Sequence, residues 1–206
     1  MKKIFFYSLI ILFISFTSCK KEKAQTTEDK VALNSYIIDV ENSVINWTAY
    51  KTTDKLPVKG VFTEVKIKKS VAASNPIEVL NGMEFEIPVS SIFSKDSIRD
   101  GKLNKFFFEV MKNTLKLKGT FSIDEDGKGK ISLTMNGLTK DLPFDYSIKG
   151  DSIDISATMN LDTWEAQAAI ATLNEACNAL HTGTDGVSKT WNEVAINAQI
   201  ITILEK

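Results

Sequence analysis

Apolar and polar residues alternate along most of the chain after about residue 36. The clearest run spans residues 113–123, where the apolar residues share one side: Leu115, Leu117, Phe121 and Ile123. Lysine, threonine and serine occupy the intervening positions. A period of two places such residues on opposite faces of a β-strand. The pattern therefore predicts a sheet with one face against a core and the other in water.

The same alternation predicts further strands, in residues 44–50, 61–67, 83–89, 131–135, 142–148, 153–161 and 193–203. Turn clusters at residues 126–129 and 149–151 join neighbouring strands. About eight short strands with short links favour an antiparallel β-barrel or sandwich. Rows of lysine and glutamate would be costly on a lipid-facing side. We therefore expect an all-β soluble barrel with its apolar face inside.

Two segments break the alternation and predict helices. Residues 97–108 are expected to form a short helix, which Gly101 weakens. Residues 163–180 are rich in alanine and leucine and predict a longer helix. Thr163 is a candidate N-cap for it, and Gly183 lies just beyond its end.

The first residues have the pattern of an export signal. Residues 1–18 combine two lysines with a short apolar stretch and end in small residues before Cys19. This ending resembles the lipobox of bacterial lipoproteins, which implies cleavage before Cys19 and acylation of that cysteine. Residues 19–35 are mostly polar and are expected to be a flexible tether. The expected barrel domain then spans residues 36–206. Lys20 after the cysteine resembles cargo sent to the outer membrane, so we expect anchoring in the cell envelope, on its periplasmic or surface face.

Composition excludes several partners. The chain of 206 residues is 43% hydrophobic and 25% charged, with a formal net charge of -1. This balance gives no basic surplus for nucleic-acid binding. The single histidine argues against a multi-histidine metal site, and we expect no metal and no cofactor. A homodimer is left open.

Candidate catalytic residues are sparse. Cys177 and His181 are four residues apart and can face together on a helix, as in a zinc site or a nucleophilic pair. The alternative is a buried thiol beside a helix-terminal histidine. We find no other catalytic set and expect no enzyme. One of three interpretations of the function is a metal or redox protein that uses Cys177 and His181.

A run of three aromatic residues, Phe106-Phe107-Phe108, stands out in the short predicted helix. Three neighbouring rings cannot all face one core, so at least one should meet another surface, such as a barrel mouth. Arg99, the single arginine, lies seven residues upstream. A guanidinium near an apolar mouth can bind a phosphate or carboxylate head group. A solvated helix charge is the alternative.

Several strings together resemble the YceI-like family of bacterial lipid-binding proteins. They include residues 36–39 and 43–47, the Val58-Lys59-Gly60-Val61-Phe62 string, and residues 87–92. Arg99-Asp100, Leu103 and Phe106-Phe107 follow in order, and then residues 133–140 with Leu142-Pro143-Phe144. The resemblance covers roughly residues 36–161. The chain departs from it at Gly101-Lys102, where the family usually has histidine, and at residues 163–191, which look like a subgroup insertion able to plug the interior.

The resemblance implies a lipocalin-like antiparallel barrel with an apolar tunnel that binds polyisoprenoid or other long-chain amphiphiles. The expected function is an envelope lipoprotein that holds such a ligand for carriage, storage or stress protection. The alternative is a non-catalytic structural or interaction module with a filled barrel. The residues expected to face the ligand are Val61, Val65, Phe85, Ile87, Arg99, Phe106, Phe107, Leu117, Phe121, Phe144, Tyr146, Ile155 and Met159.

Overall fold

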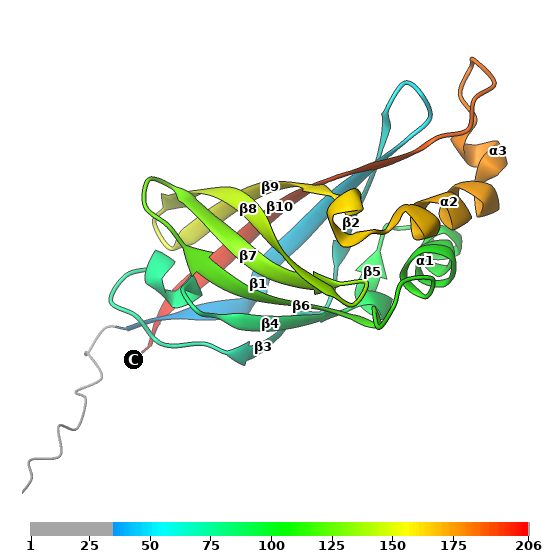
Figure 1. Cartoon of the computed structure of the whole chain (residues 1–206). Coiled ribbons are helices and arrows are strands. Elements are labelled where there is room, and N and C mark those ends of the chain that lie inside the picture. The colour runs from blue at the N-terminus through cyan, green and yellow to red at the C-terminus, as the bar shows by residue number, and fades with distance from the viewer. Residues whose placement is uncertain (1–34, 206) are drawn as a thin grey trace, which may run out of the picture. The chain divides into compact units, whose positions relative to one another are not determined.

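The computed structural model describes residues 35–205, and its strands form one antiparallel sheet of ten. They are β1 (Ser35–Lys51), β2 (Leu56–Phe62), β3 (Lys66–Lys69), β4 (Glu84–Pro88), β5 (Ile92–Phe93), β6 (Lys116–Ile123), β7 (Lys128–Met135), β8 (Leu138–Lys149), β9 (Ser152–Asn160) and β10 (Thr190–Glu205). Their order is β3-β4-β6-β7-β8-β9-β10-β1-β2-β5. The sheet curls around its apolar face as a half-barrel (Figure 1), which confirms the expected all-β, lipocalin-like class.

Helices are few, and α1, α2 and α3 gather at one end of the sheet (Figure 1). The helical segments are η1 (Ile77–Leu80), η2 (Val89–Ser91), α1 (Ser97–Leu103), η3 (Asn104–Phe108), η4 (Leu161–Trp164), α2 (Gln167–Ala176) and α3 (Asn178–His181). The Asp96 carboxylate caps α1 by accepting from the amides of Ile98 and Arg99. In residues 35–205 no helix has the length and apolar character needed to cross a membrane.

The strand count exceeds the expected eight because residues 61–67 are not one strand and because the two-residue strand β5 was not expected. The segment divides into β2 and β3, which lie near opposite ends of the strand order. Residues 63–65 carry the chain from one side of the sheet to the other. The prediction was wrong here because valine, isoleucine and lysine continue to alternate through the crossing.

The two edges of the sheet are joined by this crossing and not by a strand ladder. β3 and β5 are the edge strands, and no pairing joins them among the described strands. The Thr63 amide donates to the Ser91 carbonyl at 2.9 Å, and the Ser91 hydroxyl lies 3.4 Å from the Glu64 carbonyl. Closure on this side therefore depends on a few loop hydrogen bonds, which permit more movement than a continuous ladder.

Two further sequence-based details were wrong. Leu115 precedes β6 and is 71% exposed instead of facing the interior. The expected helix of residues 163–180 is interrupted, since Glu165 adopts a left-handed conformation with φ 53° between η4 and α2. At the break the Trp164 ring is buried, and its Nε1–H donates to the Leu133 carbonyl at 3.0 Å. Thr163 lies within η4 and does not cap α2, whose N-cap is Ala166.

Three glycines on the inner face of the sheet each lie under an aromatic ring of the paired strand. The cross-strand partners are Trp47 with Gly60, Phe85 with Gly119, and Phe144 with Gly129. A Cβ built on any of these glycines would come within 2.2–2.4 Å of the partner ring. An aromatic ring over a glycine pins the register and fills space that two side chains would otherwise share.

Replacing Gly119 by valine should destabilise the fold, because the Phe85 ring must move away. We expect a loss of about 1–3 kcal/mol in the free energy of unfolding, measured by urea denaturation. Gly101→Ala is the control, since a Cβ at Gly101 meets nothing within 4 Å. It should be neutral or stabilise by up to about 1 kcal/mol. Wild-type stability in Gly119→Val would contradict the proposed packing.

Candidate functional site

Three cavities follow one another along the inner face of β1. The far cavity is lined from Ile38 to Ile45, the middle cavity at Trp47 and Ala49, and the mouth cavity at Ala49 and Lys51. Their volumes are about 110, 110 and 190 Å³. We call the row of three the interior channel. Its mouth lies at the end of the sheet where α1, α2 and α3 gather.

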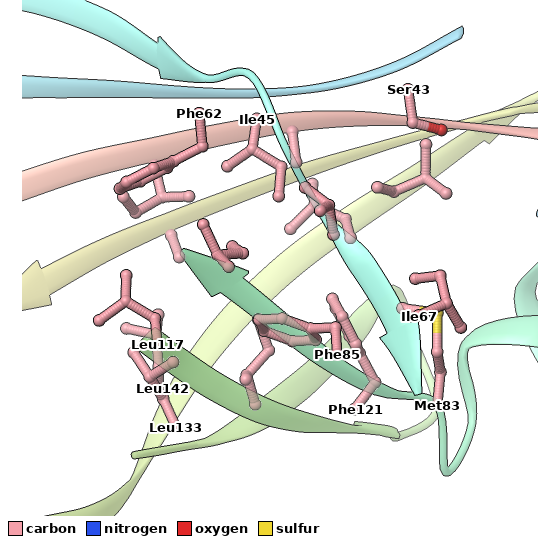
Figure 2. Close-up of a pocket in the computed structure, with 18 of the residues that line it drawn as sticks. Ser43, Ile45, Phe62, Ile67, Met83, Phe85, Leu117, Phe121, Leu133 and Leu142 are labelled. Carbon is pink, nitrogen blue, oxygen red and sulfur yellow. The ribbon is translucent and has the colours of Figure 1, made fainter. Parts of the chain in front are cut away.

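The far cavity has an almost entirely apolar wall, shown in Figure 2. Leu117, Leu133 and Leu142 line one side, and Ile45 and Phe62 lie opposite them. Ser43 is the one hydroxyl-bearing residue in the wall. Its Oγ donates to the Asp39 carbonyl at 2.6 Å and accepts from the Ile201 amide at 2.9 Å. These bonds belong to the β1 bulge, so the cavity offers a ligand no free polar partner from this side chain.

The cavities are separated by shared side chains. Phe62, Leu117, Met159 and Ile196 line both the far and the middle cavity. Ala49, Leu103 and Leu173 are among the residues shared by the middle and mouth cavities. The insertion thus contributes Leu173 to the wall through α2. Continuity between the three spaces depends on the rotamers of a few apolar side chains.

The mouth cavity differs from the other two in charge. Lys51, Arg99 and Lys102 line it together with Asp96 and His181. Arg99 lies 3.3 Å from the Asp96 carboxylate and donates to the Ser94 carbonyl at 3.4 Å. This carboxylate accepts the backbone amides of Arg99 and Ile98, and these bonds with the nearby guanidinium lower the pKa of Asp96.

His181 is held in one orientation at the mouth. Its Nδ1 lies 2.7 Å from the Thr190 hydroxyl, which itself donates to the Asn174 side chain at 2.9 Å. The hydroxyl therefore accepts from Nδ1–H, and Nε2 carries no proton in the neutral ring. Burial, and then the charges of Lys51 and Lys102, lower the pKa of His181 to about 4. The imidazole is neutral at physiological pH.

Most residues expected from the sequence line the channel, although their binding role stays a prediction. In the far cavity lie Val65, Phe85, Ile87, Leu117, Phe121, Ile155 and Met159. Phe107 lines the middle cavity and Arg99 the mouth.

Four expected residues do not line these cavities: Val61, Phe106, Phe144 and Tyr146. Phe62 lines the far cavity where Val61 was expected. The preceding inward-facing position of β2 is Gly60, which has no side chain, so the sequence gives no apolar signal for that face. The Phe144 ring packs edge-on against Phe121, with centroids 5.7 Å apart, and Tyr146 packs on Phe144. These two rings fill part of the interior. Phe106 is half-buried, with the Lys105 ammonium 5.3 Å from its ring.

The Cys177 and His181 pair lies at the mouth. The Cys177 thiol is buried, and the His181 ring is bonded to Thr190. In the part of the chain that the structure describes, no three His, Cys, Asp or Glu side chains are grouped to hold a metal ion. Lys51, Lys102 and His181 were missed as a cluster, because no spacing in the sequence indicates that residues 51, 102 and 181 meet.

A curled antiparallel half-barrel with an apolar channel is the architecture of the lipocalin-like class. The chain belongs to the YceI-like family, since the YceI-like domain matches residues 36–201. A comparison with curated protein sequences gives no match.

Solved structures with a similar fold include two bacterial proteins. One is described as a polyisoprenoid binding domain from Saccharophagus degradans implicated in plant cell wall breakdown. It has 13% identity and a TM-score of 0.56, over 84% of this chain and 99% of that one. The other is BcnA from Burkholderia cenocepacia, with 13% identity and a TM-score of 0.50, over 81% and 99% of the two chains. At these identities the likeness is one of fold.

Acidification should destabilise the protein through His181. Its pKa in the folded state is about 4, below the usual 6.5, so the unfolded chain binds more protons between these values. The stability that neutral His181 contributes is then fully present above about pH 6.5 and is lost as the pH drops toward 4. Urea denaturation between pH 5 and 7.5 should show this slope, and His181→Gln should flatten it. An unchanged slope in the variant would exclude His181 as its source.

Proposed function

We propose that the protein binds one long-chain apolar or amphiphilic lipid, with its tail along the interior channel. The observation that carries this proposal is the row of cavities whose walls are apolar from Ile38 to Ala49 and become charged only at Lys51. An apolar tail gains free energy when it leaves water, and a polar head avoids burial at the mouth. Binding and not catalysis is the proposed activity, in line with the sparse catalytic residues of the sequence.

The length of the channel favours a long chain. Strand β1 lines it from Ile38 to Lys51, and its bulge shortens the path. At about 3.3 Å per residue the lined path is roughly 30–40 Å. A single leaflet of a bilayer accommodates tails of only about 15 Å, which is half its hydrocarbon core. A polyisoprenoid or another extra-long chain matches the path better than an ordinary acyl tail. The Saccharophagus degradans relative, a polyisoprenoid binding domain, is consistent with this ligand class.

The interior must widen to admit such a chain. An engineered apolar cavity of about 150 Å³ holds a benzene molecule, and the far and middle cavities are each about 110 Å³. Met159 has a flexible side chain, and Phe62 belongs to β2, which pairs with β5 over only two residue pairs. Their movement would join the two spaces, and Phe62 lies near the side where the sheet lacks a closing ladder.

The energy available is sufficient for this rearrangement. Each buried methylene contributes about 0.8 kcal/mol, so twenty methylene-sized groups would gain roughly 16 kcal/mol before costs. Association and ordering costs of about 4–15 kcal/mol reduce this gain. Micromolar binding is compatible with the remainder.

The second candidate is a non-catalytic structural or interaction module of the cell envelope. The small cavity volumes favour it, because Phe144 and Tyr146 already fill part of the interior. In this case the apolar residues would serve only as a core.

We also propose that the protein is exported and anchored in the cell envelope through acylated Cys19, with the outer membrane as the expected destination. The support is the residue pattern of positions 1–35, which is that of a lipoprotein signal and tether. Cys19 and the signal lie outside the described residues.

Blocking the channel should remove a bound lipid. Ala49→Phe places a ring between the mouth and middle cavities, and Thr48→Phe, its neighbour outside the cavity walls, is the matched control. We expect organic extracts of purified wild type and Thr48→Phe to contain the same long-chain lipid by mass spectrometry. Extracts of Ala49→Phe should contain at least tenfold less. Reproducibly empty wild-type protein would favour the filled module instead.

Cys19→Ser tests the anchor. The variant should leave the membrane fraction and lose the mass of its acyl chains, because a single uncleaved apolar stretch of about thirteen residues is too short to span a bilayer. Cell fractionation and intact-protein mass spectrometry measure both effects, with Cys177→Ser as the control thiol. Equal membrane association of the two variants would contradict acylation at Cys19.

A further inference from the structure

The mouth cavity brings together three cationic side chains from two elements. Lys51 ends β1, and Arg99 and Lys102 belong to α1. Asp96 is the one carboxylate in the same wall. The mouth thus holds more positive than negative charge, in contrast to the apolar walls of the other two cavities.

The three cations differ in how far their charge is compensated. Arg99 forms an ion pair with Asp96 and donates to the Ser94 carbonyl. Within residues 35–205, neither Lys51 nor Lys102 has an acidic group within ion-pair distance. The two lysines therefore carry the unpaired charge of the mouth.

Each of these lysines is held by a main-chain carbonyl of the insertion. Lys51 Nζ donates to the Leu180 carbonyl at 3.0 Å, and Lys102 Nζ donates to the Ala176 carbonyl at 3.1 Å. Ala176 is the last residue of α2, and Leu180 lies in the last turn of α3. Carbonyls at helix C-termini lack intrahelical partners and favour cations. The insertion thereby orders two long side chains at the edge of the cavity.

An ammonium group has three donors, and each lysine uses one of them for the carbonyl. The others are available to a ligand without the cost of ordering the side chain again. Burial, and then the charges of both lysines, lower the pKa of His181. A second anionic partner would relieve the uncompensated charge.

We propose, building on the proposed lipid-binding function, that Lys51 and Lys102 form an anion site that selects long-chain lipids with a phosphate or carboxylate head. The carbonyls of Ala176 and Leu180 are positioning groups for this site. Binding of the head and docking of α2 and α3 then stabilise each other, because both depend on the same two ammonium groups. The insertion acts as a part of the binding site and not as a plug.

Two probes with the same tail test the selection: geranylgeranyl phosphate and geranylgeraniol. Wild type should bind the phosphate at least tenfold more tightly, since each charge-assisted hydrogen bond is worth roughly a factor of ten or more. The Lys51→Met/Lys102→Met double variant should lose this preference and bind the alcohol within twofold of wild type. The retained alcohol binding shows that the variant is folded. Lys105→Met removes a nearby positive charge outside the cavity wall and should behave as wild type.

The single histidine of the chain reports on the mouth directly. Geranylgeranyl phosphate should raise the pKa of His181 above its ligand-free value of about 4, as followed by NMR titration, and geranylgeraniol should leave it unchanged. The double variant should show a raised pKa without ligand. Inorganic phosphate alone distinguishes a free anion from a lipid head. It should shift the His181 signal only at concentrations at least a hundredfold higher than the lipid needs.

The outcomes separate the two proposals. Equal affinity of wild type for both lipids, or an unchanged preference in the double variant, would overturn the anion site and leave lipid binding intact. Failure of wild type to bind either lipid would overturn lipid binding and the anion site together. Inorganic phosphate acting at the same concentration as the phosphorylated lipid would overturn the selection of a lipid.

Discussion

The interior of this protein depends on aromatic rings laid over glycine. Three cross-strand pairs, Trp47 with Gly60, Phe85 with Gly119 and Phe144 with Gly129, bring a ring against the backbone of the neighbouring strand. A side chain at any of these glycines would push the ring away from the sheet. Phe85 also lines the far cavity and Trp47 the middle cavity, so two of these rings form part of the cavity walls.

The period-two pattern predicts the walls well because each wall residue faces inward by local alternation alone. Leu117, Phe121 and Ile155 are examples, and the structure places all three in the far cavity. Where alternation loses its side-chain signal, the prediction fails. In β2 the inward-facing position 60 is a glycine without a side chain, and Phe62 instead of Val61 lines the cavity. Alternation also continues through residues 63–65, where the chain leaves one side of the sheet for the other.

The mouth was harder to predict because tertiary contacts alone assemble it. Of its charged residues only Arg99 was expected there, and the structure pairs it with Asp96 three residues earlier. Lys51 and Lys102 donate to main-chain carbonyls that lie 129 and 74 residues away in the sequence. Gly101-Lys102 stands where the resemblance led us to expect histidine, and the one histidine reaches the mouth from α3 instead. No local pattern connects these positions.

The insertion raised the question of whether it closes the interior. If α2 filled the channel, its apolar residues would occupy the space between the walls. Instead Ile170 lines the middle cavity, and Leu173 lines both the middle and the mouth cavity. Its helix ends accept hydrogen bonds from Lys51 of β1 and Lys102 of α1 at the cavity edge. These bonds help to dock the insertion and also place positive charge at the mouth. A chain that lost the insertion would lose Ile170 and Leu173 from the cavity walls, together with the carbonyls that hold the two lysines in place.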